Sequence, residues 1–422
     1  MEDAVIHIRN RLQFTGTWPI CSEPRGDILV KVLMSVQKAD IVIAGAGLAG
    51  LTMAVEMAAR PFFDQFRIVI LERDEKTAND RTWCFWATPD EPLPPVISRS
   101  WQGAHFFGLN GFERRLGIHP YTYNMVRSSD FYGWARAIIQ QKTNMEWVEA
   151  DISSIDCAAG QVHTSKGVFE GNFVFNSAIR DFIDRKSDDA RFTRLLQHFK
   201  GWIIETDTPA FDPHAVTFMD YRIEQGADTR FVYVLPFSDK KALVEYTVFS
   251  PELLPDEVYD RELSAYISQK LNITDFRTTE TEFGVIPMTD LPVRNREGRT
   301  FHIGTAGGFV KGSSGYAFKR TQRKTVDFLN GWVSSGAPDE SLLRSKWRYR
   351  FYDSVLLRVL NNGLVPGSRF FTMLFSKLPA TLVFRFLDED STFAEDLRLL
   401  SAPPTLPFTR AAFLQIPAFH QI

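Results

Sequence analysis

An unbroken apolar run, Ile41–Ala44, is followed at once by glycines at positions 45, 47 and 50. A short continuous apolar run that ends at glycines is typical of a strand buried on both faces. The residues Leu51–Ala59 continue as an apolar helix, and Arg67–Leu71 forms a second apolar run. The pattern therefore predicts a strand, a G-x-G-x-x-G turn, a helix and a second strand.

This turn and the residue that follows the second strand predict a dinucleotide site. Gly45 permits the tight turn, Gly47 removes a Cβ that would block a pyrophosphate, and Gly50 lets the helix lie close to the strand. Glu72 follows 22 residues after Gly50, where a ribose-hydroxyl acceptor is expected. The alternative is a tight turn without a ligand, and the agreement of glycines, helix and carboxylate favours binding.

Later patterns divide the chain further. Alternating strands such as Phe231–Leu235 and Ala242–Thr247 predict a separate antiparallel layer. At Thr300–Gly308 a strand again meets glycines, among them Gly304, Gly307 and Gly308. Two glycine-rich strand exits so far apart favour an extended FAD over a nicotinamide. We expect an N-terminal extension without order (1–37), an FAD-binding domain (38–85, 119–178 and 285–340), a substrate sheet domain (86–118 and 179–284) and a helical C-terminal region (341–422).

Composition excludes several classes of protein. The 422 residues carry a net charge of −3, which gives no field to attract nucleic acid. Three cysteines, without a C-x-x-C spacing, do not form the pattern of a disulfide framework or a zinc site. We therefore expect no metal site and a cytoplasmic protein. The 36 phenylalanines require a large apolar cavity or a surface that faces a membrane.

Several motifs together resemble the bacterial type of lycopene β-cyclase, over residues 38–413. They are Asn79–Trp83, Phe218–Arg222, Tyr233–Pro236, Ala242–Thr247 and Gly284–Met288. The resemblance implies an α/β flavoprotein of the glutathione-reductase and hydroxybenzoate-hydroxylase fold group. Its reaction would turn the ψ-ends of lycopene into β-ionone rings, giving β-carotene through γ-carotene, with no net redox change. FAD would act in its reduced form, with NAD(P)H as the electron source.

The resemblance also assigns roles to single residues. Glu245 matches the family's essential acid, which would donate or steer the proton that starts cyclisation; the alternative is an exposed position in a half-buried strand. Asp220 and Arg222 form either a structural salt bridge or a group at the flavin or substrate mouth. Arg81 is expected to contact the reduced flavin or the pyrophosphate, and its alternative is an ion pair with Asp80.

A C40 hydrocarbon substrate requires contact with a bilayer. The segment 369–387 is strongly apolar with three basic residues, so it is either a helix in the membrane interface or a core helix. The resemblance thus predicts a peripheral protein on the inner face of the membrane. The rival enzyme class is an FAD-dependent monooxygenase or isoprenoid reductase that consumes NAD(P)H, and Thr305, where many hydroxylases have aspartate, argues against it. A flavin-free prenyl-lipid carrier is a third possibility.

Overall fold

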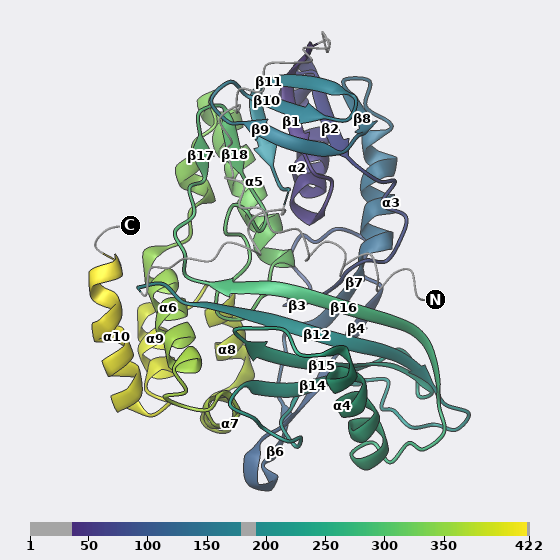
Figure 1. Ribbon diagram of the computed structural model, residues 1–422, viewed down its shortest axis with the longest axis vertical. Coiled ribbons are helices and arrows are strands. Elements are labelled where there is room, and N and C mark those ends of the chain that lie inside the picture. Colours follow the sequence, from purple (N-terminus) through teal and green to yellow (C-terminus); the bar gives the residue numbers. More distant parts are fainter. Residues whose placement is uncertain (1–35, 179–190, 420–422) are drawn as a thin grey trace.

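The computed structural model describes residues 36–178 and 191–419 (Figure 1). Most of the expected N-terminal extension lies outside these residues. Its last two positions, Val36 and Gln37, do not belong to an extension, because they pair with Val168 and Phe169 of a neighbouring strand. The first strand therefore begins two residues before the expected domain boundary at residue 38.

The upper part of the molecule in Figure 1 is built on a mixed eight-stranded sheet. Its order is β17-β18-β11-β1-β2-β8, and β10 and β9 extend from β11. The strands β1, β2, β8, β11 and β18 are parallel. The bounds are β1 Val36–Ala44, β2 Ile68–Glu72, β8 Met145–Glu149, β9 Ile152–Asp156, β10 Gln161–Thr164, β11 Gly167–Asn176, β17 Arg296–Glu297 and β18 Thr300–His302.

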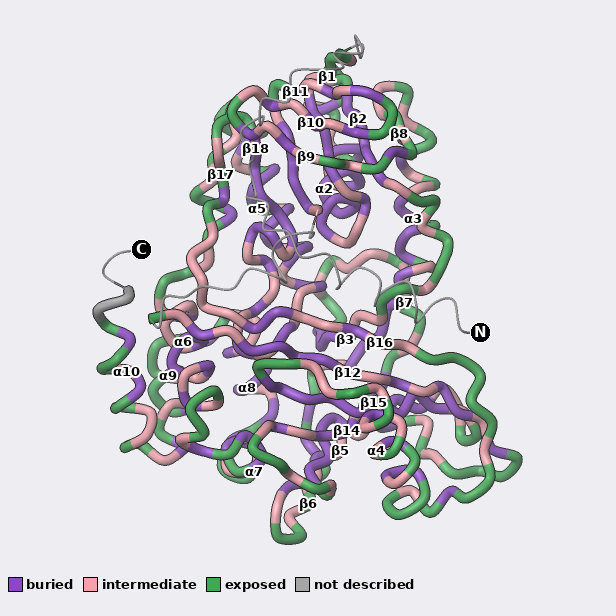
Figure 2. Tube along the Cα trace, viewed as in Figure 1, coloured by how far each residue is buried: buried purple, intermediate pink, exposed green. Residues whose placement is uncertain are grey.

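Helices cover this sheet. Figure 2 shows that β2, the second half of β1 and α2 are largely buried, as the uncharged runs of the sequence predict. The helix α2 packs against both α3 and α5. The bounds are α2 Leu48–Ala58, α3 Ser128–Ile139 and α5 Phe318–Ser335, with short 3₁₀ helices at Pro61–Gln65 and Glu340–Leu343.

A seven-stranded sheet forms the lower part, in the order β16-β12-β15-β14-β13-β5-β6. Its neighbours are antiparallel except for β5 and β13, which run parallel and so depart from the expected all-antiparallel layer. Helix α4 covers one face. The bounds are β5 Gly103–Phe107, β6 Glu113–Leu116, β12 Arg194–Glu205, β13 Ala215–Asp220, β14 Thr229–Pro236, β15 Lys241–Ser250, β16 Arg277–Thr289 and α4 Asp256–Gln269, with a 3₁₀ helix at Leu109–Gly111.

A small third sheet separates two hydrophobic cores. It consists of β3 (Thr82–Ala87), β7 (Thr122–Arg127) and β4 (Arg99–Trp101). Because successive strand residues point to opposite faces, Phe85 packs into the core of the upper sheet and Trp86 into the core of the lower one. The even-numbered residues of β3 therefore face the lower sheet.

The C-terminal region is helical, and its bounds are α6 Trp347–Asn361, α7 Gly367–Lys377, α8 Ala380–Leu387, α9 Phe393–Leu400 and α10 Thr405–Phe419. The segment 369–387 is not one helix, because Leu378 and Pro379 separate α7 from α8 and the two are bent by 119°. Phe370, Phe375 and Phe384 are buried in the core of the lower sheet, the same core that contains Trp86. No single described helix is long and apolar enough to cross a bilayer, although the bent pair α7–α8 has sufficient length and composition.

Candidate active site

The first glycine turn has the geometry of a phosphate cradle. Gly45 adopts φ +100°, a conformation that side chains disfavour. A Cβ on Gly50 would lie 1.9 Å from the carbonyl oxygen of Gly45, so only glycine lets α2 approach β1 this closely. A Cβ on Gly47 would meet no atom of residues 36–178 or 191–419 within 4 Å. The fold itself therefore leaves the space over Gly47 open.

The N-terminus of α2 borders this space. Among the described residues no side chain caps it, and its first turn contains no acidic residue, so its N–H groups and positive dipole end suit an anion. Glu72, at the end of β2, is buried beside the turn and accepts the N–H of Ala46 at 2.8 Å. Its other carboxylate oxygen accepts the N–H of Arg73 at 3.0 Å. The carboxylate is thus fixed at the edge of the cradle, where the sequence spacing predicts it.

The second glycine segment meets the first. Gly304 follows β18 with φ +61°, and a Cβ there would lie 2.9 Å from the Cβ of Ala49 in α2. A Cβ on Gly307 would lie 2.2 Å from the carbonyl oxygen of His302. Gly308 has φ +69°. The two glycine segments, 257 positions apart between Gly47 and Gly304, therefore converge on one helix end, which fits an extended dinucleotide.

Arg81 does not point clearly into this site. Its side chain is exposed and donates to the carbonyl oxygen of Asp80 at 2.6 Å. Its backbone pairs with Ser128 at the start of α3. The expected contact with the flavin stays a prediction that this placement does not support.

Glu245 lies in a row of residues that crosses the lower sheet. The register places it beside Tyr233 of β14 on one side and Gly201 of β12 on the other. Gly201 in turn pairs with Glu282 of β16. Because paired residues share a face of a sheet, Tyr233, Glu245 and Glu282 project toward the core that adjoins β3.

Glu282 is a candidate site residue that sequence reasoning missed. Its carboxyl is within hydrogen-bonding reach of the Glu245 carboxyl, and Thr82 of β3 donates to its Oε2 at 2.8 Å. Thr247 donates to Oε1 of Glu245 at 2.9 Å. Glu282 directly precedes Phe283 and the Gly284–Met288 motif, so proximity to that motif was the available signal.

The surroundings favour an uncharged Glu245. Although both glutamates keep some accessible surface, the protein around them removes most of the water. Burial raises the pKa of the Glu245 carboxyl well above its ordinary value, and the neighbouring Glu282 raises it further. Burial also raises the pKa of Glu282. Both shifts favour the protonated form, and two carboxyls this close disfavour each other's ionisation.

Aromatic side chains adjoin the pair. Tyr233 is its neighbour in the sheet, and burial raises the pKa of this phenol well above its usual range. Tyr316 lies just beyond the second glycine segment; burial raises the pKa of its phenol, and Glu245 raises this pKa further. The Tyr316 ring packs edge-on against Trp86 at 4.6 Å between centroids. Such rings can stabilise a nearby cation through their faces.

Asp220 and Arg222 are not brought to this face. Asp220 is fully buried and pairs in register with Val232, on the face that α4 covers. Arg222 Nη2 lies 2.6 Å from Asp220 Oδ2, and Tyr266 of α4 donates to the same oxygen at 2.7 Å. This geometry is that of a structural ion pair, the alternative that the sequence left open, and the catalytic role stays an unsupported prediction.

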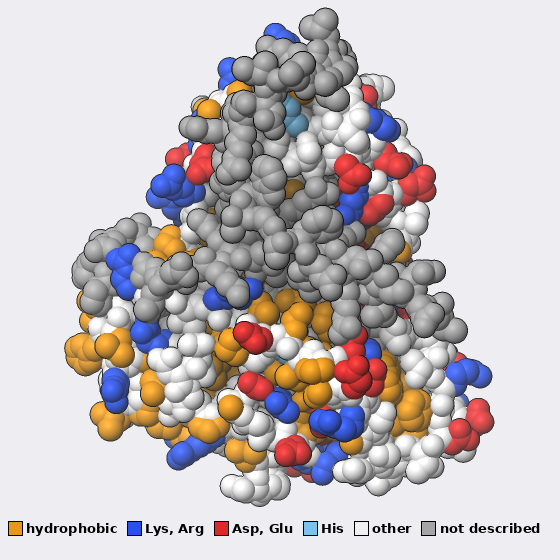
Figure 3. Space-filling model, viewed as in Figure 1, with side chains coloured by type: hydrophobic (Ala, Val, Ile, Leu, Met, Phe, Trp, Pro, Cys, Tyr) orange, Lys and Arg blue, Asp and Glu red, His pale blue; other side chains and the backbone are white. Residues whose placement is uncertain are grey.

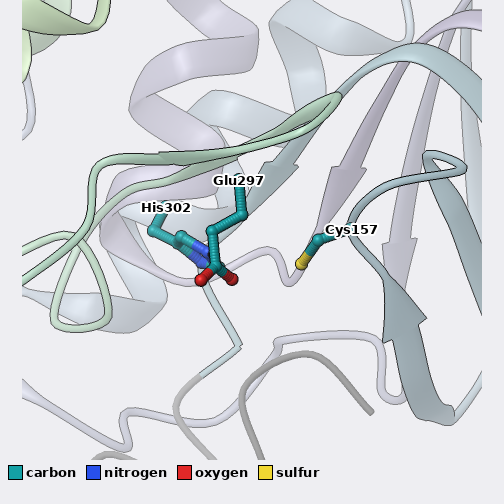
Figure 4. Close-up of side chains that lie close together, drawn as sticks. All are labelled: Cys157, Glu297 and His302. Carbon is teal, nitrogen blue, oxygen red and sulfur yellow. The ribbon is translucent and has the colours of Figure 1, made fainter. Parts of the chain in front are cut away.

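One cluster outside this site consists of side chains of the types that ligate metal ions. Cys157, Glu297 and His302 direct their ligand atoms toward one another within 4.8 Å (Figure 4). His302 already faces Glu297 at 3.5 Å and the Asn176 amide at 3.2 Å, and all three residues have further partners. The expectation that the protein binds no metal stays a prediction.

Solved structures share this architecture. A geranylgeranyl bacteriochlorophyll reductase-like protein from Thermoplasma acidophilum matches with a TM-score of 0.63 and 11% identity, over 90% of this chain and 100% of its own. The flavin-dependent halogenase Xcc4156 from Xanthomonas campestris matches with a TM-score of 0.53 and 12% identity, over 92% and 95%. The fold is therefore the FAD-binding α/β fold of flavin-dependent enzymes.

Curated relatives match nearly the whole chain. A lycopene beta-cyclase from Paracoccus sp. (strain N81106 / MBIC 01143) is 26% identical over 395 residues, which is 88% of this chain and 96% of the relative. A lycopene beta-cyclase from Pseudescherichia vulneris is 22% identical over the same shares. The family described as lycopene cyclase protein matches residues 40–413. The chain therefore belongs to the lycopene cyclase family.

Proposed function

We propose that this protein is a lycopene β-cyclase that closes the ψ-ends of lycopene into β-ionone rings. The observation that carries the proposal is Glu245, a carboxyl kept protonated by burial and by Glu282 at a wall of aromatic side chains. The names of the relatives, all lycopene beta-cyclases, support the same substrate.

The chemistry follows from this environment. Glu245 donates its proton to the terminal trisubstituted alkene, which becomes a tertiary cation. The neighbouring alkene then attacks the cation, and a ring proton leaves. The faces of Tyr233 and Tyr316 stabilise the positive charge, and the surrounding core keeps out water that would trap the cation as an alcohol.

The cofactor fit rests on the glycine segments. The open space over Gly47, the uncapped end of α2 and the carboxylate of Glu72 would hold the pyrophosphate and ribose of FAD, and Gly304 and Gly308 would admit its ribityl end. Bound FAD, reduced by NAD(P)H, would supply negative charge near the reacting cation without being consumed.

A flavin-dependent reductase is the second candidate, because the structure with a TM-score of 0.63 is reductase-like. The two functions differ in stoichiometry. A cyclase needs reduced flavin but oxidises no NAD(P)H per ring, and anaerobic dithionite should replace the nicotinamide. One NAD(P)H oxidised per product molecule would establish the reductase instead.

The test of the proposed acid is Glu245→Gln in purified, FAD-loaded protein under dithionite. Glutamine keeps the shape but has no acidic proton, so we expect cyclisation to fall by about 10²–10⁴-fold with flavin still bound. The matched control is Glu113→Gln, which removes an exposed glutamate from β6, at the opposite edge of the same sheet, and should leave the rate unchanged. Near-normal turnover by Glu245→Gln would make another group the proton donor.

The substrate also requires a route from lipid, and we propose a peripheral position on the cytoplasmic face of the membrane. The segment 369–387 offers little for this, because its large side chains are mostly buried. Six of the eleven exposed large hydrophobic side chains of the described residues lie instead on α9 and α10, and Figure 3 shows hydrophobic side chains over the C-terminal helices. They are Phe393, Leu397, Leu406, Phe413, Leu414 and Ile416.

A further inference from the structure

The carboxyls of Glu245 and Glu282 come from strands that are not neighbours. Strand β12 runs between β15 and β16, so two strand spacings, roughly 9–10 Å, separate the two backbones. The side chains nevertheless meet, because the residue between them is Gly201. A Cβ on Gly201 would lie 2.8 Å from Leu243 Cδ1 and 3.0 Å from Glu282 Cγ. Because Gly201 has no side chain, the space above it stays free, and the two glutamate side chains approach each other there.

The hydrogen-bond pattern around the pair leaves room for one more proton. Thr247 donates to Glu245 Oε1, and Thr82 donates to Glu282 Oε2. Oε1 of Glu282 is buried, and no N–H or O–H group of the described residues donates to it. An unpaired buried oxygen of this kind costs about 1–3 kcal/mol, and a proton carried by Glu245 would satisfy it.

We propose that Glu282 is the positioning partner of Glu245: the two carboxyls share one proton, which Glu245 delivers to the substrate alkene and which the pair recovers when the ring loses its proton. This inference rests on the proposed cyclase function for its second half only. The shared proton itself is a property of the protein without substrate.

The step balances without an oxidant or reductant. The O–H bond of Glu245 breaks as a C–H bond forms at the alkene, leaving two carboxylates beside one carbocation. A C–C bond closes the ring, a neighbouring C–H bond breaks, and that proton restores the O–H bond of the pair. The negative charge of Glu282 favours the protonated form of Glu245 before the reaction. During the reaction the same charge stabilises the carbocation electrostatically.

Other ionisable groups do not replace this pair. Burial raises the pKa of the Cys84 thiol, and the charges of Glu245 and Glu282 raise it further, so the thiol stays protonated. Burial likewise keeps the nearby phenols neutral. The charged groups that act on Glu282 from outside are Arg127 and Glu280, which pair with each other at 2.8 Å. The groups around the pair are Cys84, Tyr123, Tyr233, Tyr316, Arg127 and Glu280.

The decisive variant is Glu282→Gln, measured in the FAD-loaded protein without substrate by the infrared band of a protonated carboxyl group. The wild type should keep this band through neutral pH. Glu245→Gln leaves Glu282 as the only carboxyl of the pair, so the pH at which the band disappears should change. In Glu282→Gln the like charge is gone, so Glu245 should lose its proton at a pH lower by about one unit or more. The alkaline limb of the cyclisation rate should move by the same amount.

Two further variants separate the pair from a structural effect. Thr82→Val keeps both carboxyls and removes a donor that favours ionised Glu282, so the proton should be held to a higher pH. Glu113→Gln removes an exposed carboxyl from β6, at the opposite edge of the sheet, and leaves the pair and its surroundings intact, so its band should titrate as in the wild type. If Glu282→Gln and Thr82→Val both titrate like the wild type, the shared proton is disproved. A shifted band in a protein that does not cyclise lycopene would instead disprove the proposed function and leave the pair established.

Discussion

Gly47 and Gly50 belong to one turn, yet a side chain would do different damage at each. At Gly50 a Cβ would lie 1.9 Å from the carbonyl oxygen of Gly45, so a side chain there would destabilise the fold itself. At Gly47, whose φ of −80° suits any residue, a Cβ would meet no atom of the described part of the chain within 4 Å. The cost there falls on a bound pyrophosphate alone.

We therefore expect Gly47→Val to fold like the wild type and to lose FAD. The measurement compares flavin content after purification with the melting temperature of the flavin-free protein. Gly50→Val is the contrasting variant, since it should lower that melting temperature as well. Flavin retained at wild-type stoichiometry in Gly47→Val would place the pyrophosphate elsewhere.

Single residues were predictable where their chemistry is local. The glycines and Glu72 follow a fixed spacing, and the structure gathers them at one helix end. The partnership of Glu245 with Glu282 depends on the register of three strands, and no local pattern encodes that register. For the same reason the spacing of Asp220 and Arg222 could not show that they lie on the α4 side of the sheet.

At the scale of elements, α4 is docked onto the lower sheet through a buried histidine. Ser250 Oγ donates to the carbonyl oxygen of Glu252, so His198 Nε2 donates to that hydroxyl and Nδ1 accepts from Tyr259 of α4. The neutral ring is therefore fully bonded. Burial lowers the pKa of His198 to about 4, below the roughly 6.5 of an unfolded histidine.

This histidine should make the protein less stable in mild acid. The unfolded chain takes up the proton first, so the stability is complete above about pH 6.5 and is lost progressively as the pH falls toward 4. The loss amounts to about 3 kcal/mol. Urea unfolding of FAD-free protein between pH 7 and pH 4 should show a smaller decline in His198→Gln. The exposed His214→Gln is the control, and an equal decline in all three proteins would contradict the assignment.

Elements that follow a clear hydrophobic pattern in the sequence were predictable, and the breaks within such patterns were not. The buried strands and α2 follow from continuous apolar runs. The bend between α7 and α8 required weighing Pro379 against a long apolar stretch, which alone resembles an interface helix. The small sheet of β3, β4 and β7 escaped prediction because it joins segments assigned to different domains.

For the whole molecule, membrane contact is expected at α9 and α10. Leu406 is 79% exposed and Phe413 is 73% exposed, and Arg410 lies between them in the sequence. Changing both apolar residues to Asp should weaken binding to anionic liposomes by roughly 100-fold or more, since each buried side chain contributes about 1.5–3 kcal/mol. Sedimentation with vesicles measures this, with Ile97→Asp as the control on another surface. Unchanged sedimentation would assign the contact to another face.

The path of the chain between the sheets sets the order in which the molecule can be completed during synthesis. Strand β11 ends at Asn176, and its parallel partner β18 begins at Thr300, 124 residues later. A ribosome that adds roughly 5–20 residues per second needs about 6–25 s to cover this interval. Throughout that time the edge of β11 lacks β18, and α2 lacks its partner α5. The nascent flavin domain therefore exposes an unpaired strand edge and an apolar helix face until most of the lower sheet has emerged, which makes the unfinished chain a client for chaperones.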